Sequence, residues 1–547
     1  MTTATPPRPA APRPSRSQAL AALLDLPPIP EVRSPQWFER LPRWLSTGGV
    51  LVLLLAISAF ARTRTLDGQL WFEEAIATGV AHHSLGALPG VLRQAGSAPL
   101  YYALLSVWID IFGMGQAATH ALSLVLGLLT IPVAMWLGWS IGGRRAGFFA
   151  AVLFAFGSYL TRYTQETQPY ALMVLLGLLG TGAFIHGFVF RRRRWLWVFW
   201  AMLALMLYTQ GTALMFWAGA AMALVVVWWA AAPEARPGIV RDALLTFGGA
   251  LVVFVPWLPT TISQIAHDTS PWHYTPLLGA TIPSQLLGTE RVDVTLLIPV
   301  VIAVAAVAGA ARRRSPQALV FWSLIAISGT AFVVTRILGV VGPFWAWRYF
   351  AAIVPALLLL GAFATARARV VGVAAILFCI AFLANAASFA PGYKSDMQDV
   401  AAEMAPLLHP GDLVVVGQPE QTPLAWYYLP AGLRFASTTG PVSDPSYMDW
   451  SGAMSRLRTT PAQATLGRLV ATLKRGQQLL YVRPLTEGAK NWSGSWTQLV
   501  RRRSAQWGQV LTNDVTNGTL KPVAWAPHNY RGSCCVADAA VLYQKTS

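Results

Sequence analysis

The stretch QPYALMVLLGLLGTGAFIHGFVFRRRR, residues 168–194, joins a long apolar run to four consecutive arginines. A helix needs about 20 apolar residues to cross the hydrocarbon core of a bilayer. Short loops rich in Lys and Arg remain on the cytoplasmic side. We therefore predict that residues 168–190 span a membrane and that Arg191–Arg194 lies in the cytoplasm.

The whole chain has the same character. Of its 547 residues, 55% are hydrophobic and only 12% are charged, which is too apolar for a soluble protein. The net charge of +18 lies largely in short arginine clusters between apolar runs, as in cytoplasmic loops, and this pattern argues against a nucleic-acid surface. The three cysteines, Cys379, Cys534 and Cys535, are too few for a disulfide framework. The fold class predicted is an α-helical multispanning membrane protein.

One short apolar segment decides how the spans alternate. Residues 99–113 form a stretch that is short for a membrane span, and they include the charged residue Asp110. If this stretch crossed the membrane, every later arginine cluster would lie outside. We predict a helix in the outer interface instead. Eleven spans then follow from the sequence, at about 46–62, 117–142, 146–163, 168–190, 195–211, 212–232, 243–262, 293–311, 315–335, 349–365 and 370–388.

These spans divide the chain into three parts. Residues 1–45, rich in Pro and Arg, are predicted to be a disordered cytoplasmic tail. Residues 46–389 form the transmembrane domain, whose first external loop, 63–116, carries two juxtamembrane helices. Residues 390–547 alternate strand-like runs (DLVVVG, QLLYVRP, AAVLYQ) with amphipathic stretches, which predicts an extracytoplasmic α/β domain. The expected location is the plasma membrane of a bacterium.

Three arginines near the outer ends of spans break the positive-inside pattern: Arg162, Arg336 and Arg348. A single arginine there can extend to the lipid headgroups, but three together suggest a binding site. Every lysine of the chain lies at position 394 or later. If the membrane half binds a phosphate, arginine must therefore hold it, and the planar guanidinium suits that ligand.

Two adjacent glutamates, Glu73 and Glu74, lie in the first external loop beside Trp71 and Phe72. A carboxylate at this interface, facing the outer arginines, could act as a general base on an acceptor hydroxyl while the arginines hold a phosphate leaving group. The alternative is that both glutamates form the exposed face of an amphipathic helix.

Six segments in order resemble the GT-C glycosyltransferases, in the branch of the protein O-mannosyltransferases and the lipid A aminoarabinose transferase (families 39 and 83). The resemblance covers about residues 46–390. The segments are LWFEEAIA, SAPLYYALLSVWIDIFG with the span after it, TRYTQETQPYALMVLL, LMLYTQGTALMF, PWLPTTISQ and WRYFAAIVPALLLL.

The resemblance implies an inverting enzyme that takes a sugar from a polyprenyl phosphate and transfers it to an envelope acceptor. Glu73 matches the family's catalytic carboxylate, and Glu74 matches the glutamate that follows it. Arg348 matches an arginine near the lipid phosphate. Further substrate-binding positions implied or suggested by these segments are Tyr101, Glu166, Tyr170 and Trp347.

The sequence departs from the family pattern at four of these places. Glu73 replaces the usual aspartate, which keeps the charge on a longer side chain. His120 and Gln168 stand where the family has arginine, and Gln210 stands where it has histidine. We include all three among the substrate-binding candidates and expect Arg162 and Arg336 to replace the missing positive charge.

Other functions remain open. A divalent metal could bind His82 and His83 with a glutamate, although adjacent histidines on a helix point to different faces, so no cofactor is firmly predicted. A lipid-linked-sugar binding or transport protein and a membrane scaffold are the alternative functions. The sequence does not identify the sugar, and mannose and arabinofuranose are both plausible. It also does not show whether the acceptor is a glycan, a glycolipid or a protein.

Overall fold

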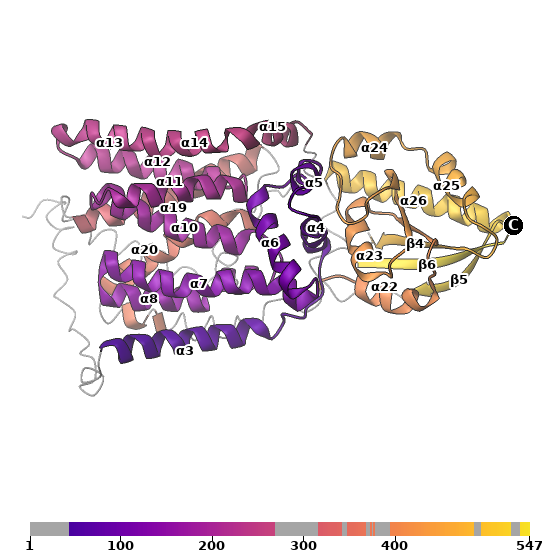
Figure 1. Ribbon diagram of the computed structural model, residues 1–547, viewed down its shortest axis with the longest axis horizontal. Helices are drawn as coiled ribbons and strands as arrows, with labels where there is room; N and C mark the ends of the chain where they lie inside the picture. The colour runs from indigo at the N-terminus through magenta and orange to yellow at the C-terminus, as the bar shows by residue number, and fades with distance from the viewer. Residues whose placement is uncertain are drawn as a thin grey trace, which may run out of the picture.

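A computed structural model of the chain describes residues 43–267, 316–341, 347–367, 372–374, 376–377, 394–485, 494–526 and 537–546. Within these residues, long helices form a bundle and short helices cover one end of it. A domain containing a β-sheet lies beyond the short helices, so that the three parts follow one another along the long axis of the molecule (Figure 1).

The bundle is built from helices of uneven length. Its first part comprises α3 (Arg43–Thr63), α7 (Gln116–Gly142), α8 (Arg144–Phe156), α9 (Ser158–Tyr163), α10 (Tyr170–Phe184) and the π-helical turn η1 (Ile185–Val189). Next come α11 (Arg194–Thr209), α12 (Ala213–Ala230) and a run of η2 (Pro233–Ala235), α13 (Arg236–Ala243), η3 (Leu244–Gly248), α14 (Gly249–Phe254), η4 (Val255–Trp257) and α15 (Leu258–His267). It ends with α19 (Pro316–Val341), η5 (Trp347–Ala352) and α20 (Val354–Arg367).

Five helical segments among the described residues are long and apolar enough to cross a membrane: Gln116–Gly142, Tyr170–Val189, Ala213–Ala230, Pro233–Ile265 and Pro316–Thr335. The protein is therefore a multi-pass helical membrane protein, as the composition predicts. The predicted span 293–311 lies outside the described residues, and so does 370–388 except at 372–374 and 376–377. The total of eleven spans thus stays a prediction.

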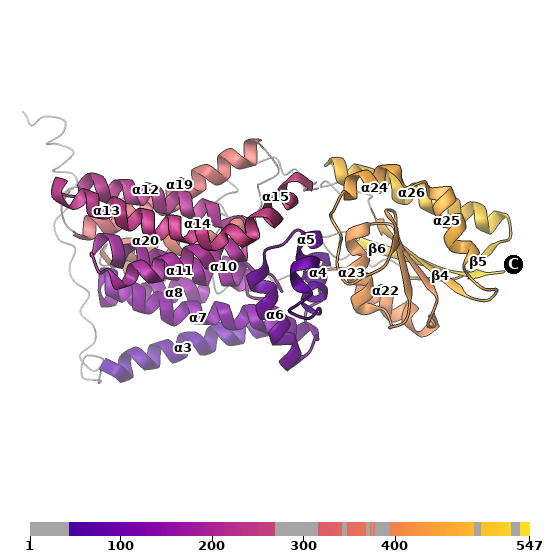
Figure 2. The same cartoon turned by 45° about the horizontal axis from the view of Figure 1, so that its top comes forward.

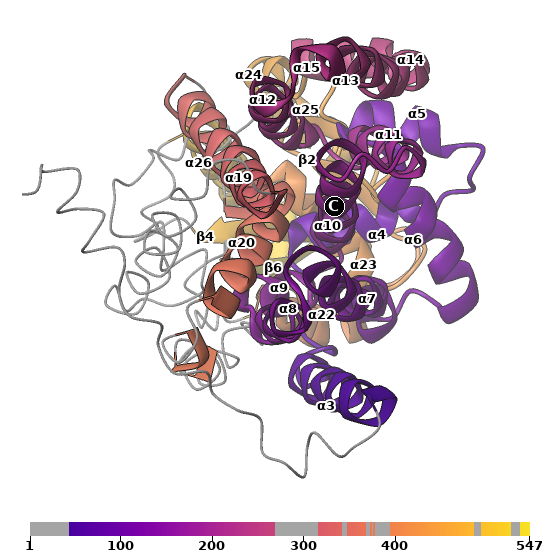
Figure 3. The ribbon, with the colours of Figure 1, turned by 90° about the vertical axis from the view of Figure 1, so that its left-hand side faces the viewer.

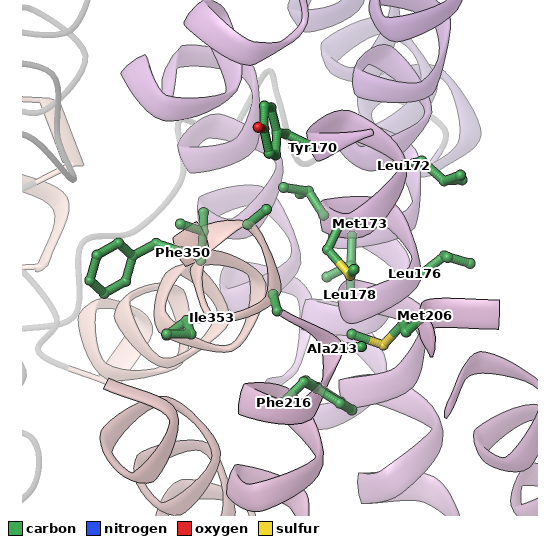
Figure 4. Close-up of a cluster of buried hydrophobic side chains, with 14 of the residues drawn as sticks. Tyr170, Leu172, Met173, Leu176, Leu178, Met206, Ala213, Phe216, Phe350 and Ile353 are labelled. Carbon is green, nitrogen blue, oxygen red and sulfur yellow. The ribbon is translucent and has the colours of Figure 1, made fainter. Parts of the chain in front are cut away.

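Helix α10 lies near the middle of the bundle when the bundle is viewed along its length, whereas α3 lies at its edge (Figure 3). In the most apolar stretch of α10 and η1, 83% of the residues are buried. Their side chains pack against those of α12 and η5. Figure 4 shows this core, with Tyr170 at one end and Met173, Phe216 and Phe350 around the helix. Helix α10 therefore holds Tyr170 in a fixed position at its N-terminus.

Glycines allow α7 and α8 to approach closely. A Cβ atom at Gly138 would lie 2.6 Å from the carbonyl oxygen of Ala146, and one at Gly147 would lie 2.6 Å from that of Met135. Small residues at such contacts are typical of helix packing in membranes, where close van der Waals contact drives association. This contact fixes the position of α9 and of the segment after it, which carries Glu166.

The loop between α3 and α7, which the sequence predicts to be external and which we call the first external loop, contains three helices: α4 (Phe72–Ala81), α5 (Leu88–Ala95) and α6 (Pro99–Phe112). Two views place them between the bundle and the C-terminal domain (Figures 1 and 2). Helix α6 coincides with the segment predicted to lie in the interface, and in Figure 1 it runs across the bundle rather than along it. Helix α5 adds to the two helices predicted, because its eight residues are few for a helix and include the turn-forming pair Pro89-Gly90.

The C-terminal domain has a six-stranded mixed sheet of order β3-β2-β1-β4-β6-β5. Strand β1 (Leu413–Val416) pairs in parallel with β2 (Arg434–Ser437) and β4 (Gln478–Leu485), while β3 (Gly440–Val442), β5 (Leu520–Ala526) and β6 (Ala537–Lys545) are antiparallel to their neighbours. The helical segments of the domain are α22 (Met397–Met404), η6 (Ala405–Leu407), η7 (Pro419–Gln421), α23 (Thr422–Tyr428), α24 (Ala453–Thr459), α25 (Ala462–Ala471) and α26 (Ser495–Thr516). The predicted α/β character of this region is confirmed.

The domain is attached directly to helix α4. Leu70 and Ala75 of the external loop are completely buried in one hydrophobic cluster with residues of α22, α23 and the sheet. The backbone N–H of Leu70 donates a hydrogen bond to the Tyr428 hydroxyl at 2.8 Å. A Cβ at Gly79 would come within 1.7 Å of the Ser446 carbonyl oxygen, so this contact requires glycine. The helix that carries both glutamates is therefore fixed between the bundle and the domain.

Candidate active site

Glu73 and Arg348 form an ion pair, with Oε1 of the glutamate 2.5 Å from Nη1 of the arginine. Both side chains are partly accessible, at 19% for Glu73 and 18% for Arg348. Burial alone would lower the pKa of Arg348, but the Glu73 carboxylate raises it well above its usual value, so the guanidinium stays charged. The two residues to which the sequence assigns base and phosphate binding are thus in direct contact.

The start of α4 explains why adjacent glutamates face different surroundings. Trp71 is the N-cap residue, and Glu74 at the third helical position accepts a hydrogen bond from the Trp71 backbone N–H at 3.0 Å. This is the return bond of a capping box, which turns Glu74 back toward the helix start. Glu73 is one residue earlier, about 100° around the helix, and points to the accessible side where Arg348 lies.

Glu74 is completely buried and surrounded by donors. Its Oε1 atom lies 2.8 Å from Lys394 Nζ, 2.8 Å from His120 Nε2 and 3.0 Å from the Thr167 backbone nitrogen. Lys394 also donates to Oε2 at 3.0 Å. Although burial opposes ionisation, Lys394 and His120 lower the pKa of Glu74 to about 2. This carboxylate is therefore a fixed negative charge with no free position for a substrate hydroxyl.

Lys394 is a site residue that no sequence motif indicates. It precedes α22 at the entrance to the C-terminal domain, yet its ammonium group is buried among residues of the external loops. Besides Glu74, it donates to the Gln165 carbonyl oxygen at 3.0 Å. This lysine reaches back across 320 residues and adds a positive charge to the region of the glutamates. Because its ammonium group bonds to Glu74, binding of a phosphate by the arginines stays a prediction.

His120 takes part in the same cluster. Its Nδ1 lies 2.7 Å from the Leu66 carbonyl oxygen, while its Nε2 faces Glu74. A carbonyl oxygen only accepts hydrogen bonds, so Nδ1 is the nitrogen that donates to Leu66. Lys394 thus provides a positive charge beside His120, at the place where the resemblance expects an arginine.

A second acidic–basic pair lies on the segment after α9. Arg162 Nε is 3.4 Å from Glu166 Oε1; the arginine side chain is 51% exposed and the glutamate only 9%. Burial raises the pKa of Glu166 above its usual value, although the charges of Arg162 and Lys394 act in the opposite direction. The charges of Glu73 and Arg348 also act on the Tyr163 hydroxyl beside this pair, so both pairs border one region.

Three tyrosines fill the space between the charged pairs. The rings of Tyr159 and Tyr163 have centroids 4.4 Å apart, and those of Tyr163 and Tyr170 have centroids 5.0 Å apart. The Tyr159 hydroxyl donates to the Arg348 carbonyl oxygen at 2.9 Å. The hydrogen bond from Tyr159 fixes the backbone of Arg348. Tyr170, one of the predicted substrate-binding residues, lies close enough to Glu73 and Arg348 for their charges to act on its hydroxyl group.

The remaining predicted residues lie at different distances from this centre. Tyr101 is buried and its hydroxyl lies 3.1 Å from Ser123 Oγ, which in turn donates to the Gln168 carbonyl oxygen at 3.4 Å. Gln168 thus contributes its backbone to a hydrogen-bonded network beside the site. Gln210 ends α11, and no described hydrogen bond of its side chain joins it to the glutamates. The side chains of Arg336 and Trp347 lie outside the described part of the structure.

The histidines considered as metal ligands make other contacts. His83 Nε2 lies 2.9 Å from Asp444 Oδ2, and its Nδ1 lies 3.0 Å from the Gly79 carbonyl oxygen. The His82 ring packs against Trp426. Within the described ranges, no group of three or more His, Cys, Asp or Glu side chains is arranged to hold a metal ion. These histidines connect the external loop to the C-terminal domain.

Comparison with known proteins gives a structural match. The structure of ArnT from Cupriavidus metallidurans bound to undecaprenyl phosphate is similar with a TM-score of 0.60 at 15% sequence identity, over 91% of this chain and 98% of that one. Its apo state gives 0.56 with the same identity and coverage. The apo oligosaccharyltransferase of Archaeoglobus fulgidus gives 0.50 at 13% identity, over 72% of this chain and 64% of that one. No protein-family model and no curated protein sequence matches. At these identities the similarity establishes the fold, and the chain has the GT-C fold of ArnT, as the sequence resemblance predicts.

Proposed function

We propose that the protein is an inverting glycosyltransferase that moves a sugar from a polyprenyl-phosphate-linked donor to a hydroxyl group of a cell-envelope acceptor. The observation that carries this proposal is the partly accessible Glu73–Arg348 pair, which joins helix α4 to η5 of the bundle. ArnT, which has the same fold, is known in complex with undecaprenyl phosphate, and this supports a lipid phosphate as one ligand.

In the proposed reaction, the Glu73 carboxylate removes the proton of the acceptor hydroxyl. The acceptor oxygen attacks the anomeric carbon from the face opposite to the phosphate, which inverts the configuration. The bond between the anomeric carbon and the phosphate oxygen breaks, and its electron pair remains on the phosphate. The charge that develops there is stabilised by Arg348, assisted by Arg162.

The two glutamates receive different roles in this proposal. Glu74 is completely buried and its two oxygens together accept hydrogen bonds from Lys394, His120 and backbone N–H groups, so we assign it to positioning. Glu73 has the ion pair with Arg348 and a partly accessible side chain, so we assign it as the general base. The capping-box geometry of Glu74 then sets the orientation of α4 and, through it, the position of Glu73.

Binding of the donor would separate Glu73 from Arg348. A phosphate is a bidentate partner for a guanidinium and competes with the carboxylate for the same N–H groups. Once Arg348 bonds to the phosphate, Glu73 is released to accept a proton from the acceptor. The ion pair thus keeps both groups charged and in place before substrate arrives.

The test uses purified protein in lipid nanodiscs with a panel of radiolabelled polyprenyl-phosphate sugars and envelope acceptors. We expect the wild type to consume one donor and to form a product of inverted anomeric configuration, measured by NMR. Arg348→Ala should weaken donor binding, and Glu73→Gln should bind donor without turnover. Binding of a donor without any transfer by the wild type would instead support a lipid-linked-sugar binding or transport protein.

A further inference from the structure

The helices of the C-terminal domain differ sharply in charge. Residues 451–477 and 494–516, which contain α24, α25 and α26, have a single acidic side chain, Asp514, among many arginines. Residues 394–428, which contain α22 and α23, have Lys394 as their only Lys or Arg and several acidic residues. One helical layer of the domain is therefore strongly basic and the other is acidic.

Some arginines of the basic layer have structural roles. Arg456 pairs with Asp449 at 3.1 Å, and Arg503 donates to the carbonyl oxygens of Leu457 and Thr460. These side chains hold α24 against α26. Because these two arginines already have partners within the domain, we do not count them as part of an interaction surface.

Six other cations of this layer are exposed and take part in none of the ion pairs found among the described residues. Clustered like charges repel one another and raise the local electrostatic potential, which attracts anions. Such a cluster costs stability unless a partner neutralises it. The six residues are Arg458, Arg468, Lys474, Arg475, Arg501 and Arg502.

The basic layer begins beside the external loop that carries the glutamates. Just before α24, the Trp450 backbone N–H donates to the Gln94 carbonyl oxygen of α5 at 2.9 Å. The other end of the layer lies at the C-terminus of the chain, where the Gly476 N–H donates to the Lys545 carbonyl oxygen at 2.9 Å. Figure 1 places the C-terminus at the end of the domain remote from the bundle.

The length of the layer distinguishes between two kinds of anionic partner. Helix α26 has 22 residues and is therefore about 33 Å long. A flat bilayer at the end of the bundle could meet only the near end of this surface, whereas Lys474 and Arg475 lie at the far end. An extended polymer can contact cations along the whole length.

We propose that α24, α25 and α26 bind a polyanionic envelope polymer, one that carries phosphate or carboxylate groups, and that this polymer presents the acceptor hydroxyl to Glu73. The role as acceptor rests on the proposed transferase function, whereas binding of the polyanion does not depend on it. Electrostatic attraction along the layer would bring the polymer to the loop end, where the glutamates lie.

The test uses the full-length protein in nanodiscs of zwitterionic lipid without any donor, so that binding is measured independently of turnover. Long-chain inorganic polyphosphate is the probe, and neutral dextran is the control polymer. Binding is followed by fluorescence anisotropy at several salt concentrations, and hydrogen–deuterium exchange locates the protected segments. A further arm replaces the probe with nanodiscs that contain anionic phosphatidylglycerol.

Two fourfold variants separate the basic layer from other basic regions. The layer variant combines Arg458→Gln, Arg468→Gln, Arg475→Gln and Arg501→Gln, and the matched control variant replaces Arg191–Arg194 by Gln. All eight positions are substituted with the same neutral residue, and thermal unfolding checks that both variants remain folded.

We expect polyphosphate to protect α24, α25 and α26 in the wild type and in the control variant, with an affinity that falls as salt rises. In the layer variant, this protection should be lost and the affinity should fall by about tenfold or more. Equal protection by dextran, unchanged protection in the layer variant, or protection by anionic lipid in place of polyphosphate would overturn the proposal. If the layer binds polyphosphate and no donor is ever consumed, the transferase function fails while the binding surface stands.

Discussion

Lys394 donates hydrogen bonds to both carboxylate oxygens of Glu74, at 2.8 and 3.0 Å, and so connects the entrance of the C-terminal domain to the helix that carries Glu73. Both side chains are buried, at 7% and 0% exposure. A charge in such surroundings is stable only with its partner. The pair therefore makes the orientation of the first external loop dependent on the domain.

Removing one member of this pair should destabilise the protein strongly. We expect Lys394→Met to cost about 3–5 kcal/mol in the free energy of unfolding, because the buried Glu74 carboxylate loses its main partner. The melting temperature of the protein in nanodiscs measures the effect. The double variant Glu74→Gln/Lys394→Met should be less destabilised than the sum of the two single variants, and simple additivity would show that the pair is not coupled.

Acid should weaken the protein through Glu74. The pKa of this carboxyl is about 2 in the folded state against an ordinary value of 4.5, so the unfolded chain binds its proton first as the pH falls. The resulting stabilisation is complete above about pH 4.5 and is lost progressively toward pH 2. The free energy of unfolding, measured across this pH range, should change less steeply with pH in Glu74→Gln than in the wild type. Equal slopes would contradict the assignment of Glu74 as an ionised buried group.

Glu166 provides the contrasting case. Its pKa is raised by burial, so the charged form is less favourable in the folded protein than in the unfolded chain, and its ionisation lowers stability as the pH rises above the ordinary value. Glu166→Gln should therefore leave the melting temperature at pH 7 unchanged or slightly higher, whereas Glu74→Gln should lower it. Loss of stability in both variants to the same degree would show that the surroundings of the two glutamates do not differ as described.

Arginine geometry at position 348 should matter more than charge alone. We expect Arg348→Lys to raise the KM for the donor by about tenfold or more, because lysine keeps the charge but loses the planar pair of N–H donors. The Tyr159 hydroxyl bonds to the backbone of Arg348, so Tyr159→Phe, which keeps the guanidinium but removes this bond, measures how much the KM depends on backbone positioning alone. A KM unchanged in Arg348→Lys would exclude bidentate phosphate binding at this residue.

The elements predicted from the sequence are those that carry a strong periodic or apolar signal. Long apolar runs identify helices such as α7, α10 and α19, and alternating or continuous apolar residues identify β1, β4 and β6. The other strands have weaker signals: β2 (RFAS) and β3 (GPV) lack the continuous apolar run of β1, and β5 contains Pro522. Short strands form only when the neighbouring strands position them.

The candidate site was predictable where it follows local motifs and not where it depends on distant contacts. The resemblance named Glu73 and Arg348, whose contact joins residues 275 positions apart. Nothing in the sequence around Lys394 indicates that its ammonium group is buried between external loops. The distinction between an accessible Glu73 and a buried Glu74 likewise requires the three-dimensional structure, because both belong to the same turn of one helix.

The most direct test of the central claim is the single-turnover rate of sugar transfer with Glu73→Gln and Glu73→Asp, measured in nanodiscs with saturating donor and acceptor. If Glu73 is the general base, Glu73→Gln should lose about 100-fold or more in rate while its donor affinity is kept or rises, and Glu73→Asp should retain part of the activity. If Glu73→Gln transfers sugar as fast as the wild type, Glu73 is not the base and the proposed mechanism is wrong.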